Sequence, residues 1–260
     1  ARGDGLTLDT AATQTLIDRC GEAGGGVVRF PPGTYLSGTL RMRSNVGLHL
    51  DAGARLLAAP CLEAFAEACK TPHGNHPGRI HALLWAEDVE NVVVQGAGVI
   101  DGGRPGPLTI PESAALAFRP TLVFYRNCRN VRFLDVTLAN SDMWTLHLQR
   151  CADVMVRGVT IRNNPRRINS DGIDPDGCRN VVISDCAIVA GDDCICIKST
   201  EGDPCENIVV SNCVLSTTCA ALKIGTEALG PIRNVAFNNC VIHNTNVALA
   251  LYMKDGSVYE

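Results

Sequence analysis

Two acidic clusters lie about one structural repeat apart in the sequence. The first contains Asn169 and Asp171, in the stretch Asn-Ser-Asp-Gly-Ile-Asp-Pro-Asp-Gly. The second contains Asp192 and Asp193, in Gly-Asp-Asp-Cys-Ile-Cys-Ile-Lys. Carboxyl groups that are held close together repel one another, so that one stays protonated while its neighbours ionise. An acid and a base side by side are what hydrolysis of a glycosidic bond requires.

The two clusters can meet only if the chain stacks them, and a repeat in the sequence indicates how. A turn residue followed by Val or Ile recurs at intervals of 27 at Asp153, Asn180, Asn207 and Asn234. A second short, β-branched strand follows each of them within about five residues. Repeats of this length with β-type alternation indicate a solenoid, whose coils lie roughly 4.8 Å apart. We therefore predict an all-β fold, a single right-handed parallel β-helix domain over residues 1–260, which places both acidic clusters on one patch.

The ends and turns of the solenoid are also predicted. Asn at a fixed turn position suits a left-handed bend, and stacked Asn side chains can hydrogen-bond to one another. Residues 9–20 have apolar side chains at helical spacing, so we predict a short helix, capped by Asp9 or Thr10, that covers the N-terminal end. Residues 60–70 show helix-like spacing too. Residues 249–254 resemble a strand with no cap after it, so further residues or a neighbour should cover that end.

The thirteen cysteines recur with the repeat rather than in pairs. Cys186, Cys213 and Cys240 are 27 residues apart, and a second series contains Cys128, Cys151, Cys178 and Cys205. One cysteine per repeat is typical of a small apolar residue in an interior column, so we favour buried thiols over a disulfide ladder. No Cys-x-x-Cys zinc motif occurs. His73, His76 and His81 fit no ligand motif either, and we expect a surface or cleft-edge loop there, without metal or cofactor.

Composition narrows the class of partner. The chain has 46% hydrophobic residues, a formal charge of -4 and a pI near 5.9. Nothing in this balance indicates a nucleic-acid partner. No apolar run approaches the roughly 20 residues that a membrane span needs. The sequence starts at Ala1 without Met, so a leader can have been removed, and we expect a secreted or periplasmic protein.

With these motifs the chain resembles glycoside hydrolase family 28, the polygalacturonase family, over nearly its whole length. Shared blocks begin at Phe30 (Phe-Pro-Pro-Gly-Thr-Tyr-Leu), Leu48 (Leu-His-Leu-Asp-Ala-Gly-Ala) and Asn140 (Asn-Ser-Asp-Met-Trp-Thr-Leu-His). The pairing of Asn-Ser-Asp with Gly-Asp-Asp is the most specific feature. The resemblance implies a parallel β-helix that hydrolyses glycosidic bonds with inversion and without a cofactor.

The resemblance also implies roles for the three aspartates. Asp192 is the expected general acid, and Asp171 and Asp193 are expected to position and deprotonate the attacking water. An inverting site keeps its acid and base about 6.5–9.5 Å apart to leave room for that water. Asn169 of the first cluster is expected to contact the substrate.

Two departures from the family bear on the substrate. The family's Gly-His-Gly histidine falls on Cys219 or Ala220, and its Arg-Ile-Lys appears as Tyr252-Met-Lys254, while Lys223 is an additional cation. Tyr252, Lys223 and Lys254 are the residues expected to hold the substrate there. Arginine grips a carboxylate in two places, whereas tyrosine offers one hydroxyl and a stacking face. We therefore expect a related pectic or less charged sugar chain rather than unmodified polygalacturonan.

Further candidates lie near the acidic clusters. Trp144 and His147 belong to the preceding coil, and Trp144 either stacks on a sugar or belongs to the core. Lys198 follows the acidic pair at alternating spacing, and we favour a cleft cation over a solvated surface residue. Binding of an anionic polymer by this acidic chain is expected to depend on local cations, namely Arg166, Arg167, Lys198, Lys223 and Lys254.

Three other functions remain open from the sequence alone. The acidic residues can form a turn ladder that binds water or calcium, although their spacing is not that of an EF-hand. The protein can be a non-catalytic carbohydrate-binding or adhesin-like β-helix, as the missing histidine indicates. It can also be a calcium-dependent pectin-type lyase. Fold alone does not separate these functions.

Overall fold

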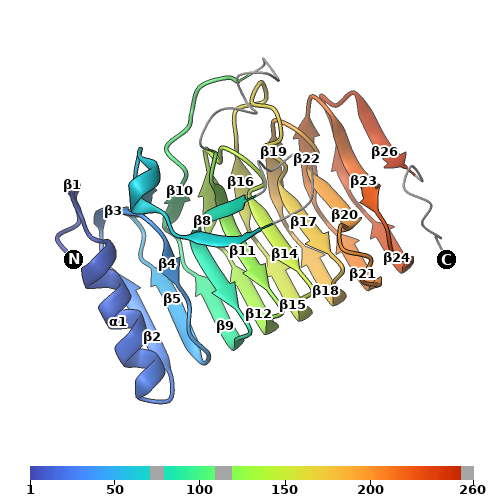
Figure 1. Cartoon of the computed structure of the whole chain (residues 1–260). Helices are drawn as coiled ribbons and strands as arrows, with labels where there is room; N and C mark the ends of the chain where they lie inside the picture. Colours follow the sequence, from blue (N-terminus) through green and yellow to red (C-terminus); the bar gives the residue numbers. More distant parts are fainter. Residues whose placement is uncertain (71–78, 109–118, 253–260) are drawn as a thin grey trace.

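Three parallel sheets run the length of the molecule, and each coil of the chain contributes one short strand to each sheet (Figure 1). The computed structural model describes residues 1–70, 79–108 and 119–252. The architecture is the predicted right-handed parallel β-helix, in which parallel strands are joined by right-handed connections. No coil can bury its apolar residues alone, so each one stacks on the next.

The strands fall into three sheets according to their place in the coil. The first sheet contains β1 (Asp4–Leu8), β3 (Gly33–Ser37), β6 (Ala54–Ala58), β10 (Val99–Asp101), β13 (Thr137–Ala139), β16 (Thr160–Arg162), β19 (Ala187–Ala190), β22 (Val214–Thr217) and β25 (Val241–Ile242). The second contains β4 (Leu40–Arg41), β8 (Arg79–Glu87), β11 (Thr121–Arg126), β14 (Leu146–Gln149), β17 (Ile173–Asp176), β20 (Ile195–Ser199), β23 (Ala220–Ala228) and β26 (Val247–Leu251). The third contains β2 (Gly26–Phe30), β5 (Val46–Leu50), β9 (Glu90–Gln95), β12 (Arg129–Leu134), β15 (Ala152–Arg157), β18 (Arg179–Ser184), β21 (Cys205–Ser211) and β24 (Ile232–Asn238).

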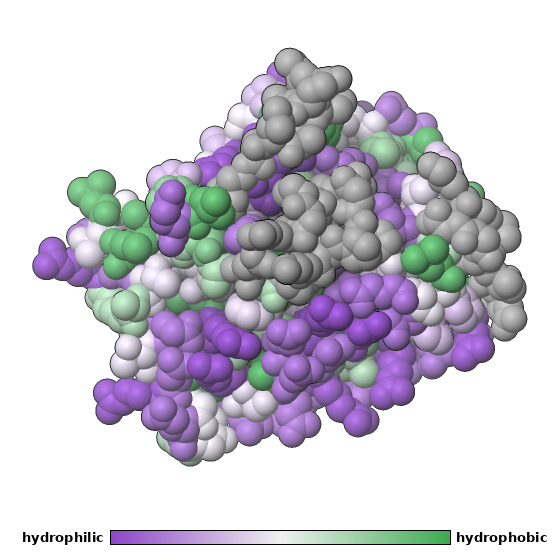
Figure 2. Space-filling model, viewed as in Figure 1, coloured by the Kyte–Doolittle hydropathy of each residue, from purple (hydrophilic) through white to green (hydrophobic). Residues whose placement is uncertain are grey.

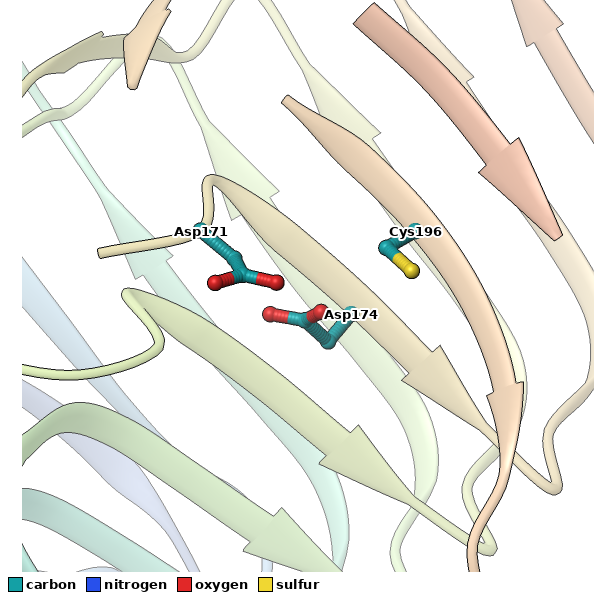
Figure 3. Close-up of side chains that lie close together, drawn as sticks. All are labelled: Asp171, Asp174 and Cys196. Atoms are coloured by element: carbon teal, nitrogen blue, oxygen red, sulfur yellow. The ribbon is translucent and has the colours of Figure 1, made fainter. Parts of the chain in front are cut away.

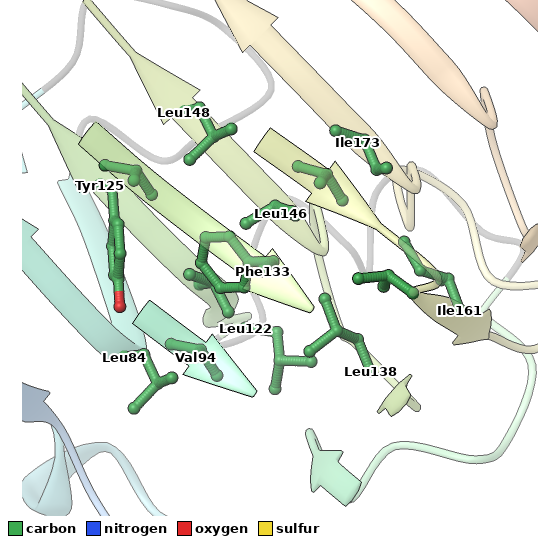
Figure 4. Packing of buried hydrophobic residues seen from close by; sticks show 14 of the residues in the cluster. Leu84, Val94, Leu122, Tyr125, Phe133, Leu138, Leu146, Leu148, Ile161 and Ile173 are labelled. Carbon is green, nitrogen blue, oxygen red and sulfur yellow. The ribbon is translucent and has the colours of Figure 1, made fainter. Parts of the chain in front are cut away.

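Columns of apolar side chains fill the space between the sheets. Alternate residues of each third-sheet strand point inward, and one buried column in register consists of Val131, Val154, Val181 and Ile208. Figure 4 shows aromatic and aliphatic side chains from neighbouring strands packed together in this interior. Burial of each aliphatic side chain stabilises the folded state by roughly 1.5–3 kcal/mol. A shift of strand register by one residue would expose all the inward side chains of that strand.

The predicted Asn ladder is confirmed. Turn residues on successive coils have φ between 52° and 62°, the left-handed region. The Asn180 side chain donates to Asp153 at 2.9 Å, Asn207 to Asn180 at 3.0 Å, and Asn234 to Asn207 at 3.0 Å. Asn is frequent here because it tolerates this bend and each amide both donates and accepts.

The N-terminal helix is confirmed, but its predicted cap is not. Helix α1 covers Thr10–Glu22, and Asp9 occupies the position before it without a side-chain hydrogen bond to the helix. The Asp9 carboxylate instead accepts the backbone N–H groups of Arg2 at 2.6 Å and Gly3 at 2.9 Å. Within the described ranges, no helix has the length and apolar character that crossing a bilayer requires.

The helix-like spacing of residues 60–70 is misleading. A 3-10 turn covers only Leu62–Ala64, and the chain is extended at Phe65. Strand β7 (Glu67–Lys70) then pairs antiparallel with β8. The tertiary pairing therefore overrides the local pattern. Of the three histidines, His73 and His76 lie outside the described residues.

The cysteine column is confirmed. Strand register places Cys186, Cys213 and Cys240 on successive coils, the first two buried and the third half-buried at the end. Every cysteine whose side chain the structure describes is a free thiol. In the second series, the backbone N–H of Cys151 donates to the sulfur of Cys178 at 3.3 Å. Burial raises the pKa of the Cys151 thiol, so it stays protonated and unreactive.

Polar residues line the outside of the solenoid. In Figure 2, hydrophilic residues dominate the lower edge of the front face, the edge at which β12, β15 and β18 are labelled in Figure 1. Ion pairs such as Arg129–Asp153, 3.0 Å apart, lie on this exterior. Buried charged groups are instead concentrated around the second sheet, where the acidic clusters lie.

Candidate active site

The two acidic clusters lie in the turns that lead into second-sheet strands. Asp171 precedes β17, and Asp192 and Asp193 precede β20. The turns are stacked, because the backbone N–H of Gly172 donates to the carbonyl oxygen of Asp193 at 2.8 Å. The predicted convergence of the two clusters is therefore present in the structure.

Glycines allow the two turns to approach this closely. A Cβ atom on Gly172 would lie 2.3 Å from the carbonyl oxygen of Cys194. A Cβ atom on Gly191 would lie 2.2 Å from the carbonyl oxygen of Arg167. Both positions therefore require glycine, which explains why a glycine stands beside the aspartates in each motif.

Asp192 and Asp193 are held by different donors. Asp192 is half-buried, and its two oxygens accept the backbone N–H groups of Asn169 and Asp193, each at 3.0 Å. Asp193 is 1% exposed and accepts the ammonium group of Lys223 at 2.7 Å and the N–H of Ala220 at 3.2 Å. The Lys223 bond is charge-assisted and therefore strong.

The carboxyls of Asp192 and Asp193 lie close together. One oxygen of Asp192 lies within 4.8 Å of one oxygen of Asp193. This limit concerns single oxygens of adjacent residues, whereas the separation of roughly 6.5–9.5 Å was expected between an acid and a base on neighbouring coils. That separation stays a prediction.

Asp171 lies at the base of the cluster. The residue is only 3% exposed, so the carboxyls do not all line one open groove as we expected, and only Asp192 of the three is more than slightly exposed. Burial, and then the charges of Asp174 and Asp192, raise the pKa of Asp171, against the opposing effect of Lys198. The prediction that at least one carboxyl of the cluster has a raised pKa is confirmed.

Lys198 is buried beneath the carboxyls. It is 2% exposed, which excludes a solvated surface position. Its ammonium group lies 2.9 Å from Glu227, 3.7 Å from Asp174 and 3.8 Å from Asp171. The same group lies 4.3 Å from the centre of the Trp144 ring, a cation–π contact.

Trp144 and His147 support the site from within. Both are buried, and their rings meet edge to face at 4.7 Å. His147 Nε2 lies 3.0 Å from a carboxylate oxygen of Asp176. Neither side chain presents a face on which a sugar can stack, so we replace the expected substrate contact by a packing role under Lys198.

Tyr252 and Lys223 form the exposed cationic side of the site. Tyr252 is 48% exposed, and the ammonium group of Lys223 lies 5.3 Å from the centre of its ring. Lys223 is already ion-paired with Asp193. Lys254 lies outside the described residues.

Cys219 occupies the neighbourhood that the family's histidine was expected to fill. Its sulfur lies within 4.8 Å of one oxygen each of Asp192 and Asp193, whereas Ala220 has no polar side chain. Burial, and then the charges of Asp193 and Asp192, raise the pKa of the Cys219 thiol. The group is thus a neutral thiol that can donate a weak hydrogen bond to the carboxylates.

Several residues of the site were not predicted. Asp174 on β17 and Glu227 on β23 flank Lys198, and Arg119 donates to the side-chain oxygen of Asn169 at 3.0 Å and to Asp142 at 3.3 Å. Asp174 could have been found from the sequence, since it stands three residues after Asp171 in the same acidic stretch. Arg119 and Glu227 could not, because their partners are distant in sequence.

Among the residues that the structure describes, two groups of side chains have atoms close enough to share a metal ion. One contains Asp171, Asp174 and Cys196, and the other contains Asp192, Asp193 and Cys219. Each includes a thiol, which is a soft ligand, whereas calcium takes six to eight oxygen ligands. Neither group therefore has the donor set of a calcium site.

Comparison with known proteins agrees with this geometry. Residues 59–257 match the model of a family described as glycosyl hydrolases family 28. A probable polygalacturonase of Vitis vinifera is 31% identical over 207 residues, which cover 76% of this chain and 42% of the relative. An endo-polygalacturonase of Pectobacterium carotovorum is 26% identical over 74% of this chain and 52% of its own.

A solved structure supports the same placement. The exopolygalacturonase of Thermotoga maritima superposes with a TM-score of 0.86 at 27% identity, over 100% of this chain and 69% of that protein. The curated relatives are longer, and this chain spans about half of their length or less. The match covers the stacked turns with Asp171, Asp192 and Asp193. The chain thus belongs to glycosyl hydrolases family 28.

Proposed function

We propose that this chain hydrolyses glycosidic bonds of a pectic polysaccharide or oligosaccharide. The observation that carries the proposal is the stack of Asp171, Asp192 and Asp193 on adjoining turns. Such a set offers both a protonated and an ionised carboxyl at one place, as glycoside hydrolysis needs. Family membership and the names of the relatives support the pectic substrate.

The roles follow from exposure and from hydrogen bonds. Asp192, the most exposed of the three, is the general acid: it gives its proton to the glycosidic oxygen as the bond from that oxygen to the anomeric carbon breaks. A water molecule bonds to the anomeric carbon from the opposite face and gives a proton to Asp193. Lys223 holds Asp193 for this role, and Asp171 orients the water. Inversion of configuration is carried over from the family.

The cationic side of the site favours a substrate with less charge than polygalacturonan. Lys223 is engaged by Asp193, and Tyr252 stands where the family has arginine. A substrate carboxylate would therefore compete with Asp193 for one ammonium group and otherwise meet a neutral hydroxyl. A substituted or less charged pectic chain avoids this competition.

Replacement of Asp192 by its amide tests the catalytic role. Asp192→Asn should lower kcat by about 10²–10⁴-fold with little change in KM, because general acid catalysis acts in the transition state. The matched control is Asp153→Asn, which puts Asn where neighbouring coils already carry it, and it should keep wild-type turnover. Products from a panel of pectic oligosaccharides measure both. Full activity of Asp192→Asn would place the acid elsewhere.

Two other functions give different results in the same assays. A carbohydrate-binding or adhesin-like protein, favoured by Cys219 in place of histidine, would bind the oligosaccharides without cleaving them. A calcium-dependent lyase would give unsaturated products that absorb in the ultraviolet and would stop when a chelator is added. The thiol in each candidate metal group speaks against this lyase. A secreted or periplasmic location forms part of our proposal, since a polymeric substrate is met outside the cell.

A further inference from the structure

Asp174 is a buried carboxyl that the proposed reaction does not use directly. It lies on β17, is 0% exposed, and neither of its oxygens accepts a hydrogen bond from a donor among the described residues. The ammonium group of Lys198 is 3.7 Å away, beyond hydrogen-bonding distance. An ionised carboxylate in such a place is costly.

The carboxyl of Asp174 faces that of Asp171. Figure 3 shows the two groups pointing toward each other, with Cys196 to one side. Oxygens of the two lie within 4.8 Å of one another. Asp171 is 3% exposed, so Asp174 is the deeper of the two.

The cations around this pair are shared with other carboxylates. The titratable groups that face it among the described residues are Lys198, Arg119, Cys196, His147, Asp193, Asp192 and Glu227. Lys198 lies 3.7 Å from Asp174 and 3.8 Å from Asp171 but is closest to Glu227, at 2.9 Å, and Arg119 pairs with Asp142 at 3.3 Å. Because no cation serves the pair alone, ionisation of both buried carboxyls is disfavoured.

We propose that Asp174 is a positioning residue that keeps a proton at neutral pH and donates a hydrogen bond to Asp171. That bond keeps Asp171 ionised and aims it at the attacking water. The inference rests on the proposed function for its purpose, but the shared proton is a property of the folded protein alone. Burial raises the pKa of both Asp171 and Asp174, as expected for a pair that shares one proton, and the greater depth of Asp174 is our reason for placing the proton on it.

The shared proton has a consequence for stability that needs no substrate. A carboxyl whose folded pKa lies above its unfolded value binds more protons in the folded state, so the free energy of unfolding falls as pH rises between the two values. Between pH 5 and 7, the free energy of unfolding should fall more steeply with pH for wild type than for Asp174→Asn. The difference between the two slopes should correspond to one proton. Urea unfolding at several pH values measures the slopes.

Asp153→Asn serves as the control for these slopes. Its hydrogen bond from Asn180, outweighing some burial, lowers the pKa of Asp153 in the folded state. The group is therefore ionised in both states above pH 5, and its replacement should leave the slope unchanged. Equal slopes for wild type and Asp174→Asn would overturn the proposal. If Asp174→Asn does not fold, the slope of wild type alone is the test. A free energy of unfolding that does not fall between pH 5 and 7 would then overturn the proposal.

Activity then tests what the hydrogen bond does. Asp174→Leu removes the donor, so Asp171 ionises less readily and the acidic limb of kcat/KM should move up by about one pH unit or more. Asp174→Asn keeps an N–H donor and should keep the limb near that of wild type. A purely structural role would predict lower activity without this shift, and identical limbs in the two variants would contradict the positioning role.

The two assays separate the two ideas. If wild type cleaves no pectic substrate, the proposed function fails, while the unfolding slopes still report on the shared proton. If wild type is active but the slopes of wild type and Asp174→Asn agree, the shared proton is wrong and the hydrolase stands.

Discussion

Tyr252 and Lys223 are the residues at which this chain departs most from its family in charge. The ammonium group of Lys223 donates to Asp193 at 2.7 Å and lies 5.3 Å from the Tyr252 ring. One lysine therefore contacts both the carboxylate that we propose as the base and the substrate side of the site. A guanidinium in place of Tyr252 would add a second cation on the substrate side of the site.

We expect Tyr252→Arg to raise activity on polygalacturonic acid relative to neutral or substituted pectic oligosaccharides. A charge-assisted bond contributes roughly 1.5–3 kcal/mol, against about 1 kcal/mol for a neutral one, so the ratio of kcat/KM values should rise by about ten-fold. The gain should shrink when salt is added, because part of it is Coulombic. Reducing-sugar release from the two substrates measures the ratio.

Tyr252→Lys is the matched control for geometry. It adds the same charge without a two-pronged donor, so it should give a smaller gain than arginine if the substrate carboxylate is bound at two points. Two results together would contradict our view of this side of the site: wild type already prefers polygalacturonic acid, and Tyr252→Arg only lowers its activity.

At the residue scale, the sequence predicts which acidic residues come together better than it predicts which side chains surround them. Asp171, Asp192 and Asp193 are found because their motifs are short and local. The burial of Lys198 is not, because its nearest partner, Glu227, comes from another coil and approaches it to 2.9 Å. Long-range partners of this kind leave no local spacing.

The turns before β17 and β20 are the elements that position the site. Each is fixed by a glycine whose missing Cβ leaves room for a backbone carbonyl of the adjoining segment. The repeat also made the strands predictable, because each coil repeats the same inward columns. The helix-like spacing of residues 60–70 misled the prediction for the opposite reason. These residues lie outside the repeat, and the pairing of β7 with β8 decides their structure.

Gly172→Ala should damage both the fold and the site. The added Cβ would lie 2.3 Å from the carbonyl oxygen of Cys194, so the stacked turns must separate. Overpacking of this kind costs about 1–3 kcal/mol of unfolding free energy, and misplacement of Asp171 by even about 1 Å can lower kcat by about 10²-fold. Urea unfolding and turnover measure the two effects.

Gly106→Ala is the control for this prediction. A Cβ at Gly106 meets nothing within 4 Å, so stability and activity should stay near those of wild type. If Gly172→Ala is as stable and active as Gly106→Ala, the close approach of the two turns does not hold the site together.

At the scale of the whole molecule, the balance of charge opposes an anionic polymer. The chain carries a formal net charge of -4. The cations that we expected to overcome this repulsion are largely engaged, since Lys198 pairs with Glu227, Lys223 with Asp193 and Arg167 with Asp142. Of these expected cations, Arg166 lies exposed on the surface.

Salt should therefore help wild type bind polygalacturonic acid. The Debye length falls from about 30 Å at 0.01 M to about 8 Å at 0.15 M ionic strength, which screens repulsion between the acidic protein and the polymer. We expect KM for polygalacturonic acid to fall several-fold over this range, while KM for a neutral pectic oligosaccharide stays constant. The neutral substrate separates screening from any effect of salt on the fold. A rise of KM with salt would mean that attraction at the site outweighs the net charge, and that the cations near Asp193 grip the polymer after all.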